Sequence, residues 1–88
     1  MVWKVEFDPR ALDELERLDR QAQRDVVRYL RERIATMEDP RRFGKPLRRD
    51  MAGLWRYRVA DYRIVCEIRE AEVVVFVVRV AHRSRVYE

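Results

Sequence analysis

The sequence predicts an α+β fold, in which a helical hairpin packs on one face of a four-stranded, mostly antiparallel sheet in the order βααβββ. Two observations support this fold class. Apolar residues recur at helical spacing between residues 9 and 37, and they follow strand patterns at residues 3–7 and in three runs after residue 53. A chain of 88 residues with 48% hydrophobic content can bury one modest core, so residues 1–88 are expected to form a single domain.

The first strand and the two helices follow from the N-terminal half. Apolar and charged residues alternate over residues 3–7, which predicts a strand with one buried face. Asp8 and Pro9 are typical of an N-cap and a first helical position, and this first helix is expected to end near Leu18. A second helix, ending near Met37, is predicted from apolar residues at steps of four: Ala22, Val26, Leu30 and Ile34. Only two or three residues connect the two predicted helices, so the helices are expected to form an antiparallel hairpin.

The remaining strands come after a loop. Residues 38–53 lose periodicity, and prolines and glycines punctuate them, so a basic loop is expected there. Strands are predicted over residues 54–59, 62–69 and 73–80, with connections short enough for hairpins. The run VVVFVV at residues 73–78 is apolar on both faces. The last strand is therefore expected to be central, beside the first strand.

Charge indicates the kind of partner. The chain has 20 basic and 16 acidic residues, a net charge of +4, and 18 of the basic residues are arginine. Residues 1–38 hold eight basic and nine acidic side chains, whereas residues 39–88 hold twelve and seven. A localised positive field rich in guanidinium groups favours partners that carry phosphates. A genome that favours arginine codons would give a similar composition. The positions of the arginines must therefore show whether they form a phosphate-binding surface.

Several classes of protein are excluded at this stage. Lys4, Glu6 and Asp8 interrupt the apolar N-terminal residues, so no signal peptide or membrane span is expected and the protein is predicted to be cytoplasmic. Cys66 is the only cysteine and His82 the only histidine. No internal disulfide, zinc cluster or other metal cofactor is therefore expected, and Cys66 is interpreted as an inert core residue.

Strand alternation places arginines together on one face of the sheet. In LWRYRV, the apolar side chains of Trp55, Tyr57 and Val59 are expected to face the helices, and the two arginines to face away. In the next strand the outward set is Arg63, Val65 and Glu67. The sequence therefore predicts that three arginines converge on the uncovered face of the sheet: Arg56, Arg58 and Arg63.

The chain ends with AHRSRVYE, which adds His82, Arg83, Arg85 and Tyr87. The segments LRRDMAGLWRYRVADYRIVCEI and VVVFVVRVAHRSRVY resemble the RelE/ParE superfamily of type II toxin-antitoxin toxins, and more closely its RelE branch. The predicted element order fits the RelE-like fold along the whole chain. The resemblance implies a metal-independent endoribonuclease, an mRNA interferase that enters the ribosomal A site, cuts the messenger there and inhibits translation.

The resemblance also implies a site. The family's basic and aromatic active-site positions match Arg56, Arg58, Tyr62, Arg63, Arg83 and Tyr87. The arginines would meet the charge on the reacting phosphate, and Arg83 would contact that phosphate or protonate the leaving group. The best-known RelE has lysines at the positions of Arg56 and Arg58, and a guanidinium is a poor general base. The base is therefore either His82 or Tyr87. RNA contacts are expected from Tyr62, Lys45, Arg48, Arg49 and Arg85.

Two other functions stay open. ParE-type members of the same superfamily poison DNA gyrase and do not cut RNA, and a basic RNA-binding module would perform no chemistry. Both toxin hypotheses imply a cognate acidic antitoxin that forms a hetero-oligomer with this chain, over the helical hairpin or along a sheet edge.

Overall fold

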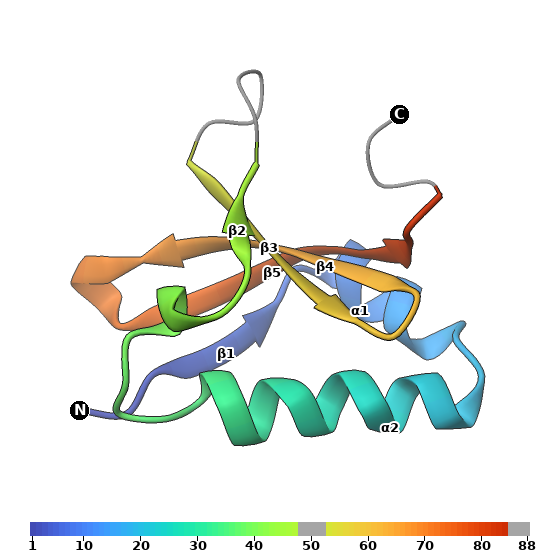
Figure 1. The fold of residues 1–88 in the computed structure, drawn as a ribbon, viewed down its shortest axis with the longest axis horizontal. Coiled ribbons are helices and arrows are strands. Elements are labelled where there is room, and N and C mark those ends of the chain that lie inside the picture. The colour runs from blue at the N-terminus through green and yellow to red at the C-terminus, as the bar shows by residue number, and fades with distance from the viewer. Residues whose placement is uncertain (48–52, 85–88) are drawn as a thin grey trace.

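A five-stranded sheet with both helices on one face forms the fold (Figure 1). The structure is a computed structural model that describes residues 1–47 and 53–84. Along the chain the helices and strands are β1 Lys4–Phe7, α1 Pro9–Glu16, α2 Arg20–Tyr29, β2 Lys45–Pro46, β3 Leu54–Val59, β4 Tyr62–Arg69 and β5 Val74–His82. The strand order across the sheet is β1-β5-β4-β3-β2.

Short side chains cap both helices. The Asp8 carboxylate accepts a hydrogen bond of 2.9 Å from the Arg10 N–H, and the Asp19 carboxylate accepts one of 2.7 Å from the Ala22 N–H. Only residues 17–19 separate α1 from α2, which confirms the helical hairpin. The second helix is shorter than predicted, because α2 continues as a single π-helical turn, Leu30–Ile34, and then ends.

The order of the strands confirms the central position of the valine-rich run. β5 pairs in parallel with β1 and antiparallel with β4, so both of its edges are occupied along Val74–Val77. The prediction of four strands is wrong by one, because residues 45–46 form β2 and pair antiparallel with β3. This edge strand has two residues, one of them a proline, so it carries no alternation that a sequence pattern can reveal.

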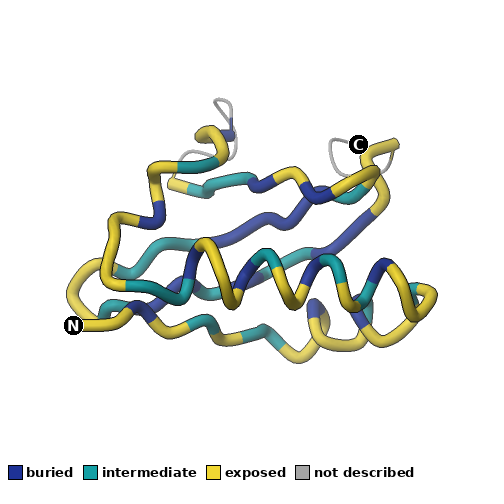
Figure 2. Tube along the Cα trace, turned by 60° about the horizontal axis from the view of Figure 1, so that its bottom comes forward, coloured by how far each residue is buried: buried dark blue, intermediate teal, exposed yellow. Residues whose placement is uncertain are grey.

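The core lies between the helices and the inner face of the sheet (Figure 2). Tyr57 is fully buried there, and its hydroxyl donates a hydrogen bond of 2.8 Å to the Pro40 carbonyl. The indole Nε1 of Trp55 donates one of 2.7 Å to the Phe43 carbonyl. The aromatic residues that alternate with arginines in β3 are thus structural, as their position on the predicted core face indicates.

A β-bulge in β5 changes which side chains face the core. Val65 pairs with Arg79, but its neighbour Cys66 pairs with Val77, so Val78 is an extra residue in β5. Val77 and Val80 are both buried in the core as a result, while Arg79 lies opposite Val65 on the other face. Without the bulge, the alternation of buried Val75 and Val77 would have directed Arg79 into the core.

Gly44 fixes the approach of β2 to β3. Its φ is +77°, and a Cβ at this position would overlap the carbonyl oxygen of Arg56 and crowd the rings of Trp55 and Tyr57. Gly44→Ala is therefore expected to lower the free energy of unfolding by about 1–3 kcal/mol, measured by urea denaturation. Gly53→Ala is the matched control for positive φ alone, since Gly53 has a φ of +91° but no neighbouring atom within 4 Å. Equal losses in the two variants would contradict the steric argument.

Candidate functional site

Basic side chains from four strands share the face of the sheet that is opposite the helices. Arg58 pairs directly with Arg63 across β3 and β4, and Arg56 pairs with Val65 on one side and with Lys45 on the other. The bulge adds Arg79 to the same face. We call this set the basic face: Lys45, Arg56, Arg58, Arg63 and Arg79. The predicted convergence of Arg56, Arg58 and Arg63 on one face is thus present in the register.

The basic face is less open than the sequence suggested. A second, small apolar cluster lies on it, formed by Leu47, Val65 and Ala81 with Leu54 and Val78 packed against them. Arg63 lies on β4, between the flanking strands β3 and β5, and is only 7% exposed. The prediction of an uncovered surface is therefore wrong at Arg63, because side chains of the neighbouring strands shield a residue in the middle of a sheet.

The buried guanidinium of Arg63 is not fully satisfied. Its Nε and Nη1 atoms have no hydrogen-bond partner within the described part of the chain. In the same part of the chain, no carboxylate forms an ion pair with Arg63 or with Arg58 opposite it. A buried polar N–H without a partner costs free energy, so two such groups on one cation mark a position suited to an anion.

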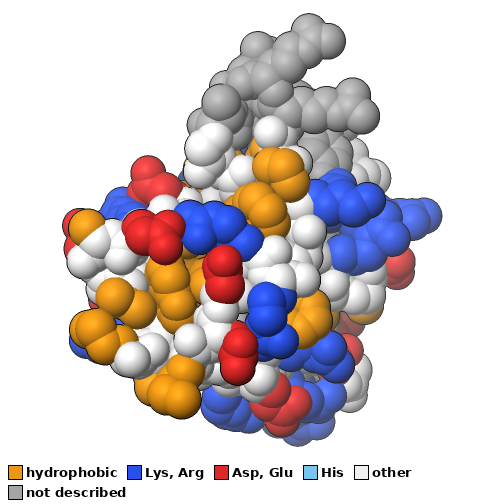
Figure 3. Space-filling view, turned by 60° about the vertical axis from the view of Figure 1, so that its left-hand side comes forward, with side chains coloured by type: hydrophobic (Ala, Val, Ile, Leu, Met, Phe, Trp, Pro, Cys, Tyr) orange, Lys and Arg blue, Asp and Glu red, His pale blue; other side chains and the backbone are white. Residues whose placement is uncertain are grey.

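Ion pairs neutralise the arginines at the end of the sheet where β4 ends and β5 begins. Figure 3 shows basic, acidic and apolar side chains side by side on the left-hand side of the molecule as seen in Figure 1. Arg69 contacts Glu67 at 2.7 Å, and Arg41 contacts Glu70 at 2.8 Å. Glu67, the one acidic residue expected on the basic face, is therefore engaged by a neighbour. The acidic side chain does not neutralise Arg58 or Arg63.

Tyr62 and His82 lie on the helix side of the sheet, away from the basic face. They pair across the ends of β4 and β5, and their rings meet edge to face with centroids 5.7 Å apart. The Nδ1 of His82 lies 3.0 Å from the Ser84 hydroxyl oxygen and 3.3 Å from the Ser84 backbone nitrogen, so Ser84 fixes the orientation of the ring. The structure thus separates these two residues from Arg58 and Arg63, with which the sequence analysis grouped them.

Arg83 follows the end of β5 and is exposed. Its backbone N–H donates a hydrogen bond of 2.8 Å to the Asp61 carbonyl, which ties the end of β5 to the β3–β4 turn. Four further residues of the predicted site lie outside the described residues: Arg48, Arg49, Arg85 and Tyr87.

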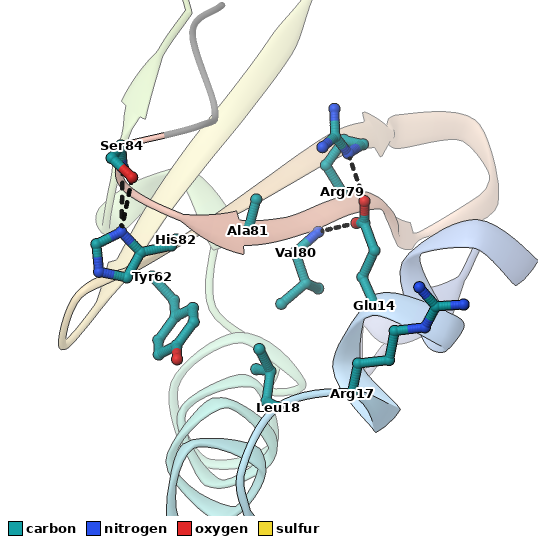
Figure 4. Close-up of a pocket in the computed structure, with 9 residues that line it drawn as sticks. All are labelled: Glu14, Arg17, Leu18, Tyr62, Arg79, Val80, Ala81, His82 and Ser84. Atoms are coloured by element: carbon teal, nitrogen blue, oxygen red, sulfur yellow. Dashed lines mark hydrogen bonds and ion pairs between the residues drawn. The ribbon is translucent and has the colours of Figure 1, made fainter.

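A cleft of about 620 Å³ opens between the end of α1 and the ends of β4 and β5 (Figure 4). Its lining residues come from three elements and the turns beside them: Glu14, Arg17, Leu18, Tyr62, Arg79, Val80, Ala81, His82 and Ser84. Glu14 joins α1 to β5, because its Oε1 accepts a hydrogen bond of 2.7 Å from the Val80 N–H and its Oε2 accepts one of 2.9 Å from Arg79 Nε.

The sequence analysis missed Glu14, Arg17 and Arg79. Arg79 did carry a signal, since it is an arginine at a position where valine alternation predicts a buried side chain. Such a conflict indicates a bulge. No sequence signal distinguishes Glu14 and Arg17, because polar residues are common on the surface of a helix and at its end.

The distribution of possible metal ligands and the environment of Cys66 are both defined within the described residues. Residues 1–47 and 53–84 contain no group of three His, Cys, Asp or Glu side chains that could hold a metal ion. Cys66 is buried in the core, and burial raises the pKa of its thiol far above the usual value. No helix in the described part of the chain is long and apolar enough to cross a membrane.

A family model described as "ParE toxin of type II toxin-antitoxin system, parDE" matches residues 5–87. The chain belongs to this toxin family. It is 32% identical over 87 residues to Toxin RelG of Mycobacterium tuberculosis, and the match covers 99% of this chain and 98% of that protein. The resemblance to the RelE/ParE superfamily is thereby confirmed, and the chain is a toxin of a type II toxin-antitoxin system.

Solved structures support the same assignment. A chain of the toxin-antitoxin complex RelBE2 from M. tuberculosis superposes with a TM-score of 0.85 at 31% identity, covering 96% of this chain and 94% of that one. The isolated RelE toxin of E. coli gives a TM-score of 0.74 at 25% identity, covering 97% and 88%. The predicted RelE-like α+β fold is therefore confirmed, with five strands in place of four.

Proposed function

We propose that this toxin is a ribosome-dependent mRNA endonuclease that inhibits translation in the cytoplasm without a metal ion. The observation that carries the proposal is Arg63, a buried guanidinium directly opposite Arg58, with two nitrogen atoms that have no hydrogen-bond partner among the described residues. Attack of a ribose 2′-hydroxyl on the adjacent phosphate builds negative charge on the phosphoryl oxygens. Cations held in a partly dry site stabilise that charge more strongly than cations in water.

Each residue of the site has a role in this proposal. Arg56, Arg58 and Arg63 bind the oxygens of the reacting phosphate, and Arg83 contacts that phosphate or protonates the leaving oxygen. Lys45, Arg48, Arg49 and Arg85 contact flanking RNA phosphates, with Tyr62 as an aromatic contact.

The general base is His82 or Tyr87. An imidazole nitrogen can accept a proton, and Ser84 contacts the Nδ1 of His82 through both its hydroxyl and its backbone N–H. When Nδ1 carries the hydrogen and donates it to the Ser84 hydroxyl, Nε2 is the ring nitrogen that can take the proton. Tyr87 would need neighbouring arginines to lower its pKa, because an ordinary phenol is protonated near neutral pH.

The proposed partners are a cognate acidic antitoxin and a ribosome with messenger in its A site. Solved relatives include the RelBE2 toxin-antitoxin complex of M. tuberculosis and the intact RelBE toxin-antitoxin complex of E. coli. The net charge of +4, together with Arg58 and Arg63, which form no ion pair with any carboxylate in residues 1–47 and 53–84, favours an acidic protein partner for this chain. Such an antitoxin would hold the toxin silent in a hetero-oligomer.

One alternative has an observation in its favour. The matching family model is named for ParE toxins. Resemblance to that branch of the superfamily implies a toxin that poisons DNA gyrase and does not cut RNA. Purified toxin that traps gyrase on cut DNA, yet leaves translated messenger whole, would reverse the order of the two hypotheses.

Mapping cuts in a translated messenger by primer extension tests the proposal. Purified toxin is expected to cut within the reading frame when ribosomes are present and not when they are omitted. Arg83→Ala is expected to lower the cleavage rate by about 10- to 100-fold, because an exposed guanidinium contributes less than a buried one. The fold should survive, since the contact of Arg83 with Asp61 uses only the backbone. Intact messenger in the presence of folded wild-type toxin would refute the endonuclease proposal.

A further inference from the structure

The cleft beside α1 joins the basic face at the edge of β5. Ala81 lines the cleft and also pairs with Arg63, and Arg79 both lines the cleft and belongs to the basic face. An extended polymer that lies on Arg58 and Arg63 can therefore continue past β5 into the cleft without leaving the protein surface. The volume of about 620 Å³ falls within the range of about 300–1,000 Å³ that is usual for small-molecule sites.

We propose that this cleft is a nucleotide subsite, in which a base of the RNA next to the cleaved position packs on Tyr62 and the phosphate beside that base contacts Arg79. The inference rests on the proposed function, since it takes single-stranded RNA as the substrate. It adds a place for a flanking nucleotide that Arg58 and Arg63 do not provide.

One wall of the cleft suits a base. The Tyr62 ring is half-buried and is held edge to face against His82, and the side chains of Leu18 and Val80 complete an apolar lining. Every base has a flat π-face that can stack on an aromatic ring, and such stacking is worth about 1–3 kcal/mol per base. Figure 4 shows Tyr62, Leu18 and Val80 directed into the same space.

The opposite wall suits a phosphate. Glu14 binds only the Nε of Arg79, and within the described residues no other hydrogen bond or ion pair engages that guanidinium. Arg79 is 32% exposed, so its two remaining nitrogen atoms can be reached from solvent. A guanidinium fixed at Nε presents its other two nitrogens as a fork, the geometry that matches two phosphate oxygens. Arg17 at the rim adds a second cation, paired at 3.1 Å with exposed Asp13.

Glu14 is a positioning residue in this arrangement. β1 ends its pairing with β5 at Val77, so the backbone N–H of Val80 has no strand partner on that edge. The Glu14 carboxylate accepts from this N–H at 2.7 Å, and the same carboxylate orients Arg79. The Glu14 side chain thereby satisfies the free backbone N–H at the edge of β5 and holds the Arg79 guanidinium in one orientation.

Titration of the isolated toxin with a 2′-O-methyl trinucleotide RNA, which cannot be cleaved, tests the subsite directly. In ¹H–¹⁵N spectra we expect the largest shifts at the backbone amides of Leu18, Val80 and Ser84. Tyr62→Ala is expected to weaken the affinity about tenfold or more, whereas Tyr62→Phe, which keeps the ring, binds as wild type does.

The salt dependence of binding tests the phosphate contact. Arg79→Ala is expected to reduce the slope of log affinity against log salt concentration by about 0.7, the loss of one phosphate contact on a single strand. The matched control is Arg28→Ala, because Arg28 is an exposed arginine of α2 that also pairs with an aspartate and lies outside the cleft. An unchanged slope for Arg28→Ala, beside a reduced slope for Arg79→Ala, supports the subsite.

The outcomes separate the subsite from the proposed function. Trinucleotide shifts confined to β3 and to the amides around Arg63, or absent altogether, would overturn the subsite, as would equal salt slopes in wild type and Arg79→Ala. An antitoxin peptide that shifts the cleft amides when RNA does not would assign the cleft to protein binding and also overturn the subsite. If the cleft binds RNA as expected but the wild type cuts no messenger on ribosomes, the subsite stands and the endonuclease proposal fails.

Discussion

Arg63→Met is expected to remove most messenger cleavage and, at the same time, to make the fold more stable. Arg63 is 7% exposed, and its Nε and Nη1 have no partner in residues 1–47 and 53–84. Burial of unpaired polar groups costs about 1–3 kcal/mol, and methionine fills a similar elongated volume without them. For Arg63→Met we therefore expect a free energy of unfolding about 1–3 kcal/mol higher than that of the wild type, measured by urea denaturation.

The same Arg63→Met substitution is expected to lower the rate of messenger cleavage. In the proposed reaction, Arg63 and Arg58 face each other across β3 and β4 and meet the charge that develops on the phosphate. Loss of one preorganised donor of this kind lowers a rate by about 10²- to 10³-fold. Single-turnover cleavage on programmed ribosomes measures this loss apart from binding of the toxin.

Arg69→Met is the matched control. Arg69 lies on the same strand, but its side chain is 40% exposed, it contacts Glu67 at 2.7 Å, and its guanidinium lies over the Phe76 ring. Its replacement is expected to leave cleavage unchanged and to alter stability by less than about 1 kcal/mol. If Arg63→Met instead destabilised the fold and left cleavage intact, Arg63 would be a structural residue.

The arginines of β3 and β4 could be placed from the sequence because both strands alternate without interruption. Arg56, Arg58 and Arg63 share a face in the register, as period-two alternation predicts. The burial of Arg63 could not be predicted in the same way. Arg63 lies between Arg58 of β3 and Ala81 of β5, and this arrangement of three strands is a tertiary feature that the alternation within one strand does not show.

The cleft could not be predicted because its contacts join distant parts of the chain. Glu14 bonds to the Val80 N–H, 66 positions further along, and that N–H is available only because β1 ends its pairing at Phe7. The bulge at Val78 then decides that Arg79 faces away from the core. Helical periodicity identifies Glu14 as a polar surface residue and gives no information on its partner.

Alkaline pH is expected to unfold this protein through two buried acids. Tyr57 and Cys66 are both fully buried, and burial raises the pKa of each side chain far above its ordinary value. In the unfolded chain these groups titrate near their ordinary values, about 10 for tyrosine and about 8.5 for cysteine. The folded state keeps both groups protonated, so its stability is full below the unfolded pKa of each group and falls as pH rises above it.

The expected loss of stability at alkaline pH is large for a domain of this size. Each group that ionises only in the unfolded chain lowers the free energy of unfolding by about 1.4 kcal/mol per pH unit, so the two together remove about 4 kcal/mol between pH 9 and pH 11. Urea denaturation at a series of pH values measures this slope. Cys66→Ala should abolish the part that begins near pH 8.5, and Tyr57→Phe the part that begins near pH 10, although each variant starts from a lower stability. A slope that neither substitution changes would show that other groups govern the alkaline unfolding.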